Sequence, residues 1–164
     1  MTAVATPMQP PLTRKPRLHR LGKIYLRTPL YFLTLCTHHR AKLLANESIY
    51  TAFKEYCQHA RDRGVQVGNY VLMPDHVHFF VSIAESGPSL SIWIKSFKNS
   101  LSKTLRAQGK TAPHWQKGFF DHLVRSADSF SEKWDYVQAN PVRAGLASSP
   151  KAWPFQGFIH ELQF

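Results

Sequence analysis

The spacing of hydrophobic residues changes several times along the chain, and each spacing predicts one element. Aromatic and β-branched residues in alternating runs predict strands at 30–37, 65–73 and 76–83. The last two strands are separated by a Pro-Asp pair at 74–75, which predicts a tight hairpin turn. Between the first two strands, apolar residues at helical spacing predict a helix that ends at Gly64.

The second half of the chain predicts two more helices and one short strand. Apolar residues recur on one face over 89–107, which indicates an amphipathic helix. The segment 114–125 reads as a loop that leads into a short strand. A third helix is expected to begin with Asp128 as its N-cap, to run to about Ala139 and to end at the Asn-Pro pair 140–141.

Strands interspersed with helices and one tight hairpin predict an α+β fold, in which an antiparallel sheet carries helices packed on one face. The other face would then be free to meet a ligand. A length of 164 residues and a hydrophobic content of 43% suit one compact domain, which we place at 23–147. The Pro-rich basic segment 1–22 is expected to be a flexible arm, and the aromatic tail 148–164 to pack on or near the domain.

Basic residues strongly outnumber acidic ones, and they are clustered. The formal net charge is +11, and no Asp or Glu occurs in residues 1–46 or 86–120. Such clusters favour a polyanion, chiefly nucleic acid, although an anionic membrane surface would use the same charges and a solvated helix face is the plain alternative. The candidate DNA-binding side chains lie in the arm and in the helix over 89–107: Arg14, Lys15, Arg17, Arg20, Lys95, Lys98, Lys103 and Arg106.

The cysteine count and the apolar runs bear on the compartment. Cys36 and Cys57 form no CxxC pattern, so neither a zinc ribbon nor a disulfide scaffold is indicated. The apolar runs are too short to cross a bilayer, and the N-terminus lacks the apolar core of a secretion signal. We therefore expect a cytoplasmic protein that makes no use of a membrane.

Two histidines head the third predicted strand. Because side chains of a strand alternate between its faces, His76 and His78 project from the same face, roughly 6–7 Å apart. Two neutral imidazoles at that spacing can share a divalent cation. The alternative is that both are ordinary polar residues on the wet face of a half-buried sheet.

The last predicted helix carries a second pair of polar groups. Phe130, Trp134 and Val137 form its apolar stripe, whereas Tyr136 pairs with Asn140 at the i, i+4 spacing on another face. The hydroxyl and the carboxamide would thus lie together away from the core. A tyrosine in such a place is by itself more often a simple exposed aromatic.

Four segments together resemble one family. In chain order they are NYVLMPDHVHFFVSI, SLSIWIKSFKNSLSKTL, HWQKGFFDHLVRS and WDYVQANPVRAGL. They resemble the REP-associated tyrosine transposases, relatives of the small single-tyrosine HUH insertion-sequence transposases, and the resemblance covers roughly residues 22–157. It implies a ferredoxin-like (RRM-like) α+β sandwich of the HUH endonuclease type.

The resemblance also implies a set of site residues. His76 and His78 match the family's metal-binding histidines, and Tyr136 matches its nucleophilic tyrosine. Asn140 stands where the insertion-sequence relatives place a glutamine, so it becomes the third candidate ligand. The implied cofactor is Mg²⁺ or Mn²⁺. The implied reaction is strand cleavage and transfer through a 5′-phosphotyrosine intermediate.

Two further residues are candidates for support. Asp75 could orient a histidine or could be an ordinary turn residue, and His122 could be a general base or a structural hydrogen-bonding group. The implied substrate is single-stranded DNA folded into REP-type palindromic hairpins. We expect a monomer, with a homodimer as the alternative.

Three other functions are compatible with these residues. A non-catalytic nucleic-acid-binding module of the same fold would bind DNA without cutting it. A metal-dependent phosphodiesterase would use water and form no covalent protein–DNA product. A basic interaction protein with structural histidines would need no metal.

Overall fold

The computed structural model describes residues 28–162. The predicted arm 1–22 therefore lies outside the described residues, and with it four candidate DNA contacts: Arg14, Lys15, Arg17 and Arg20. Between residues 28 and 162, no helix is long and apolar enough to cross a membrane.

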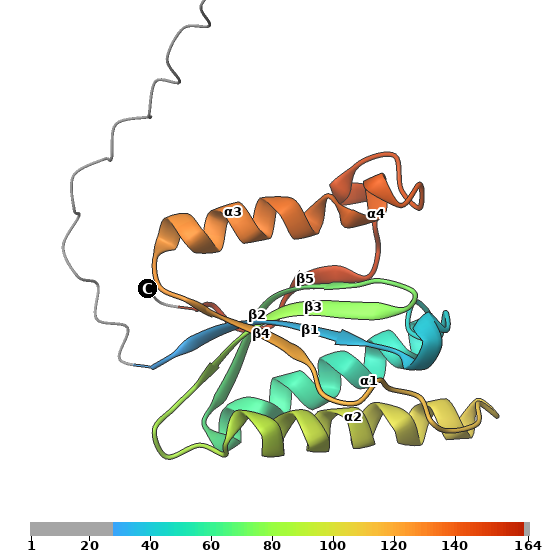
Figure 1. The fold of residues 1–164 in the computed structure, drawn as a ribbon, viewed down its shortest axis with the longest axis horizontal. Coiled ribbons are helices and arrows are strands. Elements are labelled where there is room, and N and C mark those ends of the chain that lie inside the picture. Colours follow the sequence, from blue (N-terminus) through green and yellow to red (C-terminus); the bar gives the residue numbers. More distant parts are fainter. Residues whose placement is uncertain (1–27, 163–164) are drawn as a thin grey trace, which may run out of the picture.

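The strands form one antiparallel sheet in the order β4-β1-β3-β2-β5 (Figure 1). Its strands are β1 (Leu30–Cys36), β2 (Val65–Leu72), β3 (His76–Ile83), β4 (Phe120–Val124) and β5 (Gln156–Phe158). β3 is central, because β1 and β2 pair with it on either side. The predicted α+β class and the three predicted N-terminal strands are confirmed.

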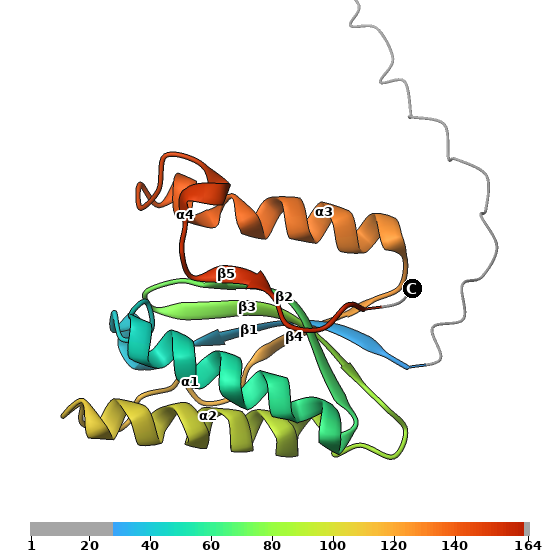
Figure 2. The same cartoon turned by 180° about the vertical axis from the view of Figure 1, so that it is seen from behind.

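Helices α1 (Glu47–Gln58) and α2 (Leu90–Ala107) cover one face of the sheet (Figures 1 and 2). Each begins at a side-chain cap: Asn46 accepts a hydrogen bond from the amide of Ile49, and Ser89 caps α2 in the same way. A 3-10 turn follows α1 and closes at Gly64, whose φ of 74° is a left-handed conformation that suits glycine. The core under these helices is aromatic, with Phe53, Phe79 and Phe97 fully buried.

The opposite face of the sheet is covered by α3 (Ala127–Gln138), so the expectation of helices on one face and a free second face needs correction (Figures 1 and 2). The physical reason is that β3 is apolar on both sides beyond its histidines. Phe80 points away from the aromatic core, is fully buried, and meets Phe130 of α3 with ring centroids 4.4 Å apart. Only burial under a second layer removes such a side chain from water.

The ends of α3 also differ from the sequence prediction. The N-cap is Ser126, whose hydroxyl accepts from the amide of Ser129, and Asp128 lies in the first turn instead. At the other end, the Asn-Pro pair closes α3 but does not stop helical structure, because α4 (Asn140–Arg143) follows at once. Proline is tolerated there, since the first turn of a helix leaves its amides unbonded.

The C-terminal tail joins the sheet. Trp153 is buried, and its indole Nε1 donates to the carbonyl of Leu72 at 3.0 Å. After it, β5 pairs with β2 and extends the sheet at that edge. Residues up to 158 are thus part of the folded unit, beyond the boundary at 147 suggested by the sequence.

Candidate metal centre and tyrosine site

His76 and His78 come together at the start of β3, on the sheet face that α3 covers. Their ring centroids are 4.7 Å apart, with the planes nearly perpendicular. Both side chains are partly buried, and the ring of His78 stacks on Phe32 of β1 at 5.5 Å. The strand register therefore produces the arrangement that the alternation of side chains predicted.

Hydrogen bonds fix both rings through the same nitrogen. His76 Nδ1 donates to Asp75 Oδ1 at 2.6 Å, and His78 Nδ1 is hydrogen-bonded to Thr34 Oγ1 at 2.7 Å. The cross-strand pairing of β1 and β3 sets Thr34 directly opposite His78. With Nδ1 occupied in each ring, Nε2 is the nitrogen that remains for a ligand.

Both imidazoles are held neutral at neutral pH. Burial lowers the pKa of His76, although the adjacent Asp75 carboxylate acts in the opposite direction. Burial, and then the charges of His76, Arg40 and Arg143, lower the pKa of His78 to about 3. A neutral imidazole keeps the lone pair that a metal ion needs.

Arg40 completes a small network around these histidines. Its Nε lies 2.9 Å from Asp75 Oδ2, and its Nη1 donates to Cys36 Sγ at 2.9 Å. His39 and Arg40 have φ values of 50° and 56°, a left-handed conformation that is strained for side-chain-bearing residues. This conformation turns the guanidinium back toward Asp75, so Asp75 is tied to His76 on one side and to Arg40 on the other.

Tyr136 and Asn140 lie where α3 ends and α4 begins. The Tyr136 side chain is 65% exposed, and the Arg143 guanidinium carbon lies 4.0 Å from its ring centroid. Arg143 Nη2 donates to the Asn140 side-chain oxygen. Tyr136, Asn140 and Arg143 therefore form one contiguous cluster, which we call the tyrosine cluster.

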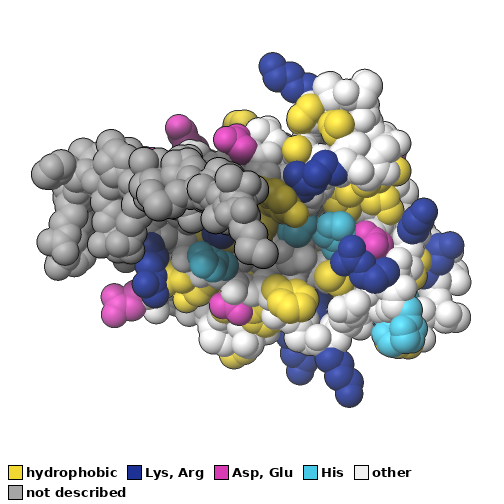
Figure 3. Space-filling view, turned by 45° about the horizontal axis from the view of Figure 1, so that its top comes forward, with side chains coloured by type: hydrophobic (Ala, Val, Ile, Leu, Met, Phe, Trp, Pro, Cys, Tyr) yellow, Lys and Arg dark blue, Asp and Glu magenta, His cyan; other side chains and the backbone are white. Residues whose placement is uncertain are grey.

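The tyrosine cluster lies at the same end of the molecule as the histidines. In Figures 1 and 2, the C-terminal end of α3 and α4 stand over the end of the sheet that carries the β2–β3 hairpin. The charge of Arg143 contributes to the lowered pKa of His78, which requires the two groups to be near each other. Figure 3 shows histidine side chains beside basic and acidic ones on this face.

The donors present suit a divalent cation. His76 Nε2, His78 Nε2 and the Asn140 carboxamide oxygen are neutral nitrogen and oxygen donors, a set that accepts Mn²⁺ or Mg²⁺. Within residues 28–162, no group of three or more His, Cys, Asp or Glu side chains could hold a metal ion. A cation held by only the three donors named above would have open coordination positions for phosphate and water.

The candidate DNA contacts on α2 lie on the other side of the sheet. They belong to α2, which covers the sheet face opposite to α3. These residues are Lys95, Lys98, Lys103 and Arg106. Lys98 is also engaged, because its ammonium donates to the carbonyls of Gln116 and Gly118 at 3.0 and 2.5 Å and burial lowers its pKa. The fold does not bring these cations to the histidines.

His122 lies on the edge strand β4, where its side chain is exposed. It pairs in register with Phe32, the residue that stacks on His78. No hydrogen bond joins the His122 ring to another residue of the described chain. The alternative role as a structural hydrogen-bonding group therefore has no partner among residues 28–162.

Three residues of the site, Thr34, Arg40 and Arg143, were not predicted from the sequence. Arg143 carried a usable signal, because Tyr136, Asn140 and Arg143 are spaced i, i+4 and i+7, which places them on one helical face. Arg40 carried none, since its approach to Asp75 depends on a left-handed turn and on the pairing of distant strands.

Comparisons with known proteins identify the family of this chain. Residues 28–140 match the family described as Transposase IS200 like. A Haemophilus influenzae protein named as a candidate REP-associated tyrosine transposase is 26% identical over 147 residues, covering 82% of this chain and 82% of the relative. The REP-associated tyrosine transposase of Escherichia coli is 22% identical over 140 residues, covering 85% and 82%.

Solved structures share the fold. The structure of a REP-associated tyrosine transposase bound to a REP hairpin matches with a TM-score of 0.66 at 23% identity, covering 85% of this chain and 82% of that one. A Deinococcus radiodurans structure matches with a TM-score of 0.51 at 18% identity, covering 73% and 96%. These matches confirm the resemblance read from the sequence.

Proposed function

We propose that this chain, which belongs to the IS200-like transposase family, cuts and rejoins single-stranded DNA at palindromic hairpins. Tyr136 is the proposed nucleophile. The observation that carries the proposal is the placement of the tyrosine cluster at the same end of the fold as His76 and His78. One chain thereby supplies every group the reaction needs, which supports a monomer as the active unit.

The reaction follows from the chemistry of a phenol. The Tyr136 oxygen bonds to the phosphorus of a phosphodiester, the bond from phosphorus to the 3′ oxygen breaks, and the phenolic proton ends on the released 3′ hydroxyl. The product is a 5′-phosphotyrosine. Its ester conserves the energy of the broken bond, so rejoining to a 3′ hydroxyl needs no ATP.

His76, His78 and Asn140 would hold Mg²⁺ or Mn²⁺ in this site. When bound, such a cation polarises a non-bridging phosphate oxygen and neutralises charge that repels the nucleophile. Asp75 and Thr34 orient the two rings so that both Nε2 atoms are available. Asn140 must exchange the hydrogen bond from Arg143 for this role.

Arg143 is proposed to assist the nucleophile. Its guanidinium carbon lies 4.0 Å from the Tyr136 ring centroid, so its positive charge can stabilise negative charge that develops on the reacting oxygens in the transition state. Arg143 also has several further N–H donors that can reach a phosphate, because only one is used by Asn140. His122 remains the candidate general base, and its side chain is exposed.

We expect Arg143→Gln to slow covalent product formation about 100-fold, the scale of losing one charged donor in an active site. Single-turnover rates at saturating DNA measure this, and hairpin affinity should change only a few-fold. Arg143→Lys should recover part of the rate, because it restores the charge without the planar fork. An unchanged rate in Arg143→Gln would remove Arg143 from the mechanism.

The proposed substrate is a REP-type DNA hairpin, because a structural neighbour is bound to a REP hairpin. The proposed DNA contacts are the cations of α2 and those of the arm, which follow the charge clusters of the chain. A DNA substrate and two free buried cysteines suit the bacterial cytoplasm.

The test is a denaturing gel of the protein mixed with labelled hairpin oligonucleotides in Mn²⁺, Mg²⁺ or chelator. The proposal requires a slow band that carries both protein and the 5′ phosphate side of the cut, and that chelator abolishes. Cleavage without a covalent band would favour the phosphodiesterase. Tight binding without any cleavage would favour the non-catalytic binding module.

A further inference from the structure

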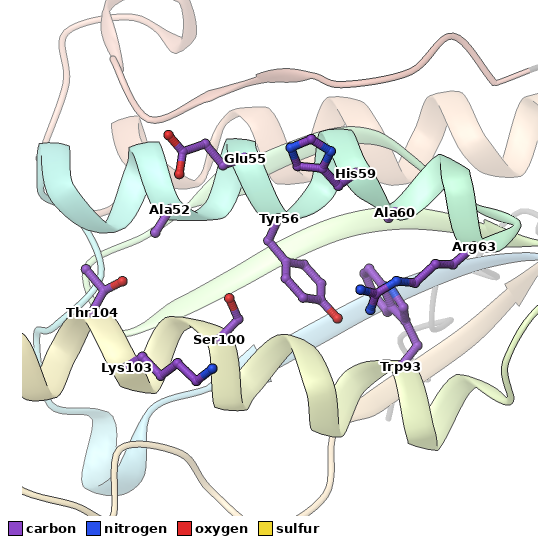
Figure 4. A pocket seen from close by; sticks show the side chains of 10 residues that line it. All are labelled: Ala52, Glu55, Tyr56, His59, Ala60, Arg63, Trp93, Ser100, Lys103 and Thr104. Atoms are coloured by element: carbon purple, nitrogen blue, oxygen red, sulfur yellow. The ribbon is translucent and has the colours of Figure 1, made fainter.

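A groove between α1 and α2 is lined by side chains of both helices (Figure 4). These helices cover the sheet face opposite to α3 (Figure 1). The groove consists of two adjoining hollows of about 600 and 460 Å³. Both are lined by Tyr56, Arg63, Ser100 and Lys103, so they form one continuous feature, which we call the α1–α2 groove.

The α1–α2 groove is cationic. Arg63, Lys95 and Lys103 line it, and among the described residues none of the three makes an ion pair with a carboxylate. Glu55 is the one acidic side chain in the lining. Cations left without partners around a hollow attract an anion, whereas a solvated helix face usually interleaves its charges.

The neutral side chains of the groove are hydrogen-bonding groups of the kind that contact phosphates. They are Ser96, Asn99, Ser100 and Thr104. Hydroxyl, amide and basic groups in one groove match the usual contacts to a nucleic-acid backbone.

The groove suits paired rather than unpaired DNA. Unpaired bases are held by exposed aromatic rings, but Trp93 in this groove is only 2% exposed and packs in the core. α2 has 18 residues, which makes it about 27 Å long and comparable to about eight base-pair steps of a duplex. The hollows are lined by α2 residues between 92 and 104, so their cations can meet successive phosphates of a stem that lies along this helix.

We propose that the α1–α2 groove binds backbone phosphates of the paired stem of the hairpin whose unpaired part is cut at Tyr136. The inference rests on the proposed function for the identity of the DNA. It adds a second contact surface on the opposite side of the sheet and brings in Arg63, a residue outside the candidate DNA contacts. Lys98 is not part of the proposed contact surface, because its ammonium donates hydrogen bonds to the carbonyls of Gln116 and Gly118.

The test compares hairpin binding by the parent protein and by the double variant Arg63→Gln/Lys103→Gln. Fluorescence anisotropy is measured at several salt concentrations with two probes: a stem-loop and an unpaired oligonucleotide of equal length. Each lost phosphate contact lowers affinity roughly eightfold near 0.1 M salt and lowers the log–log salt slope by about one. We expect at least about a tenfold loss for the stem-loop, a slope smaller by about two, and less than a twofold change for the unpaired probe.

The matched control is Lys54→Gln/Lys151→Gln, which removes the same charge from positions outside the groove. It should leave the stem-loop affinity within about threefold of the parent, because only non-specific attraction is reduced. Circular dichroism and covalent product formation at saturating DNA show that each variant is folded.

Three results would overturn the inference. Unchanged stem-loop affinity and slope would show that the groove does not meet DNA, and an equal loss on both probes would show that it does not select the stem. The inference is also overturned if the parent protein binds neither probe. A parent that binds stem-loops through the groove but forms no covalent product would instead refute the proposed function alone.

Discussion

Tyr136→Phe abolishes the covalent protein–DNA product while leaving hairpin binding nearly unchanged; this is the result we expect from deleting one oxygen atom. The substitution keeps the ring against Arg143 and removes only the nucleophile. Because no phosphoester can then form on the protein, the rate of product formation should fall at least about 1,000-fold. The side chain is largely exposed, so the free energy of unfolding should change by less than about 0.5 kcal/mol.

The measurement is product formation at saturating hairpin in Mn²⁺, followed on a denaturing gel. The matched control is Tyr31→Phe, a tyrosine of β1 that is placed on the sheet face opposite the histidines. It should form the covalent product at the parent rate. A covalent band that persists in Tyr136→Phe would identify another nucleophile, and peptide mapping of the adduct would locate it.

Removing a histidine of the pair should have the second largest effect. His78→Ala leaves one imidazole for the cation, so we expect Mn²⁺ binding to weaken more than about 100-fold and product formation to fall by a similar factor. His76→Ala should behave in the same way. Calorimetric titration of Mn²⁺ into the DNA-free protein measures binding without any dependence on activity.

Two further variants separate metal binding from structural damage. Thr34→Val keeps His78 but removes the group that fixes its Nδ1, and should weaken Mn²⁺ binding about 10-fold to 100-fold. His59→Ala removes an exposed histidine on the far side of the sheet and should leave Mn²⁺ binding unchanged. If His78→Ala bound Mn²⁺ as tightly as the parent, the histidines would be ordinary sheet residues.

Local spacing accounts for most of what could be predicted of the site. The alternation of a strand placed His76 and His78 on one face, and the i, i+4 spacing paired Tyr136 with Asn140. The cap of α3 was placed two residues late, because Asp128 and Ser126 are both good capping residues and their sequence signals are similar. Such errors shift a boundary without changing which residues share a face.

Relations between elements were beyond the reach of local spacing. The contacts of Thr34 with His78 and of Arg40 with Asp75 join residues 44 and 35 positions apart in the chain, and they depend on the pairing of β1 with β3. The same holds for the position of the α2 cations on the side of the sheet opposite the histidines.

The sequence by itself determined the strands and helices from β1 to α3, the α+β class, the two pairs of candidate site residues and the cationic character of the chain. It did so because backbone periodicity and charge are properties of short segments. Only the tertiary structure decided that α3 covers the second face, that Arg143 and Arg40 join the site, and that Lys95 and Lys103 line a separate groove. Those outcomes depend on burying Phe80 and its apolar neighbours under a second layer, which is a requirement of the whole fold.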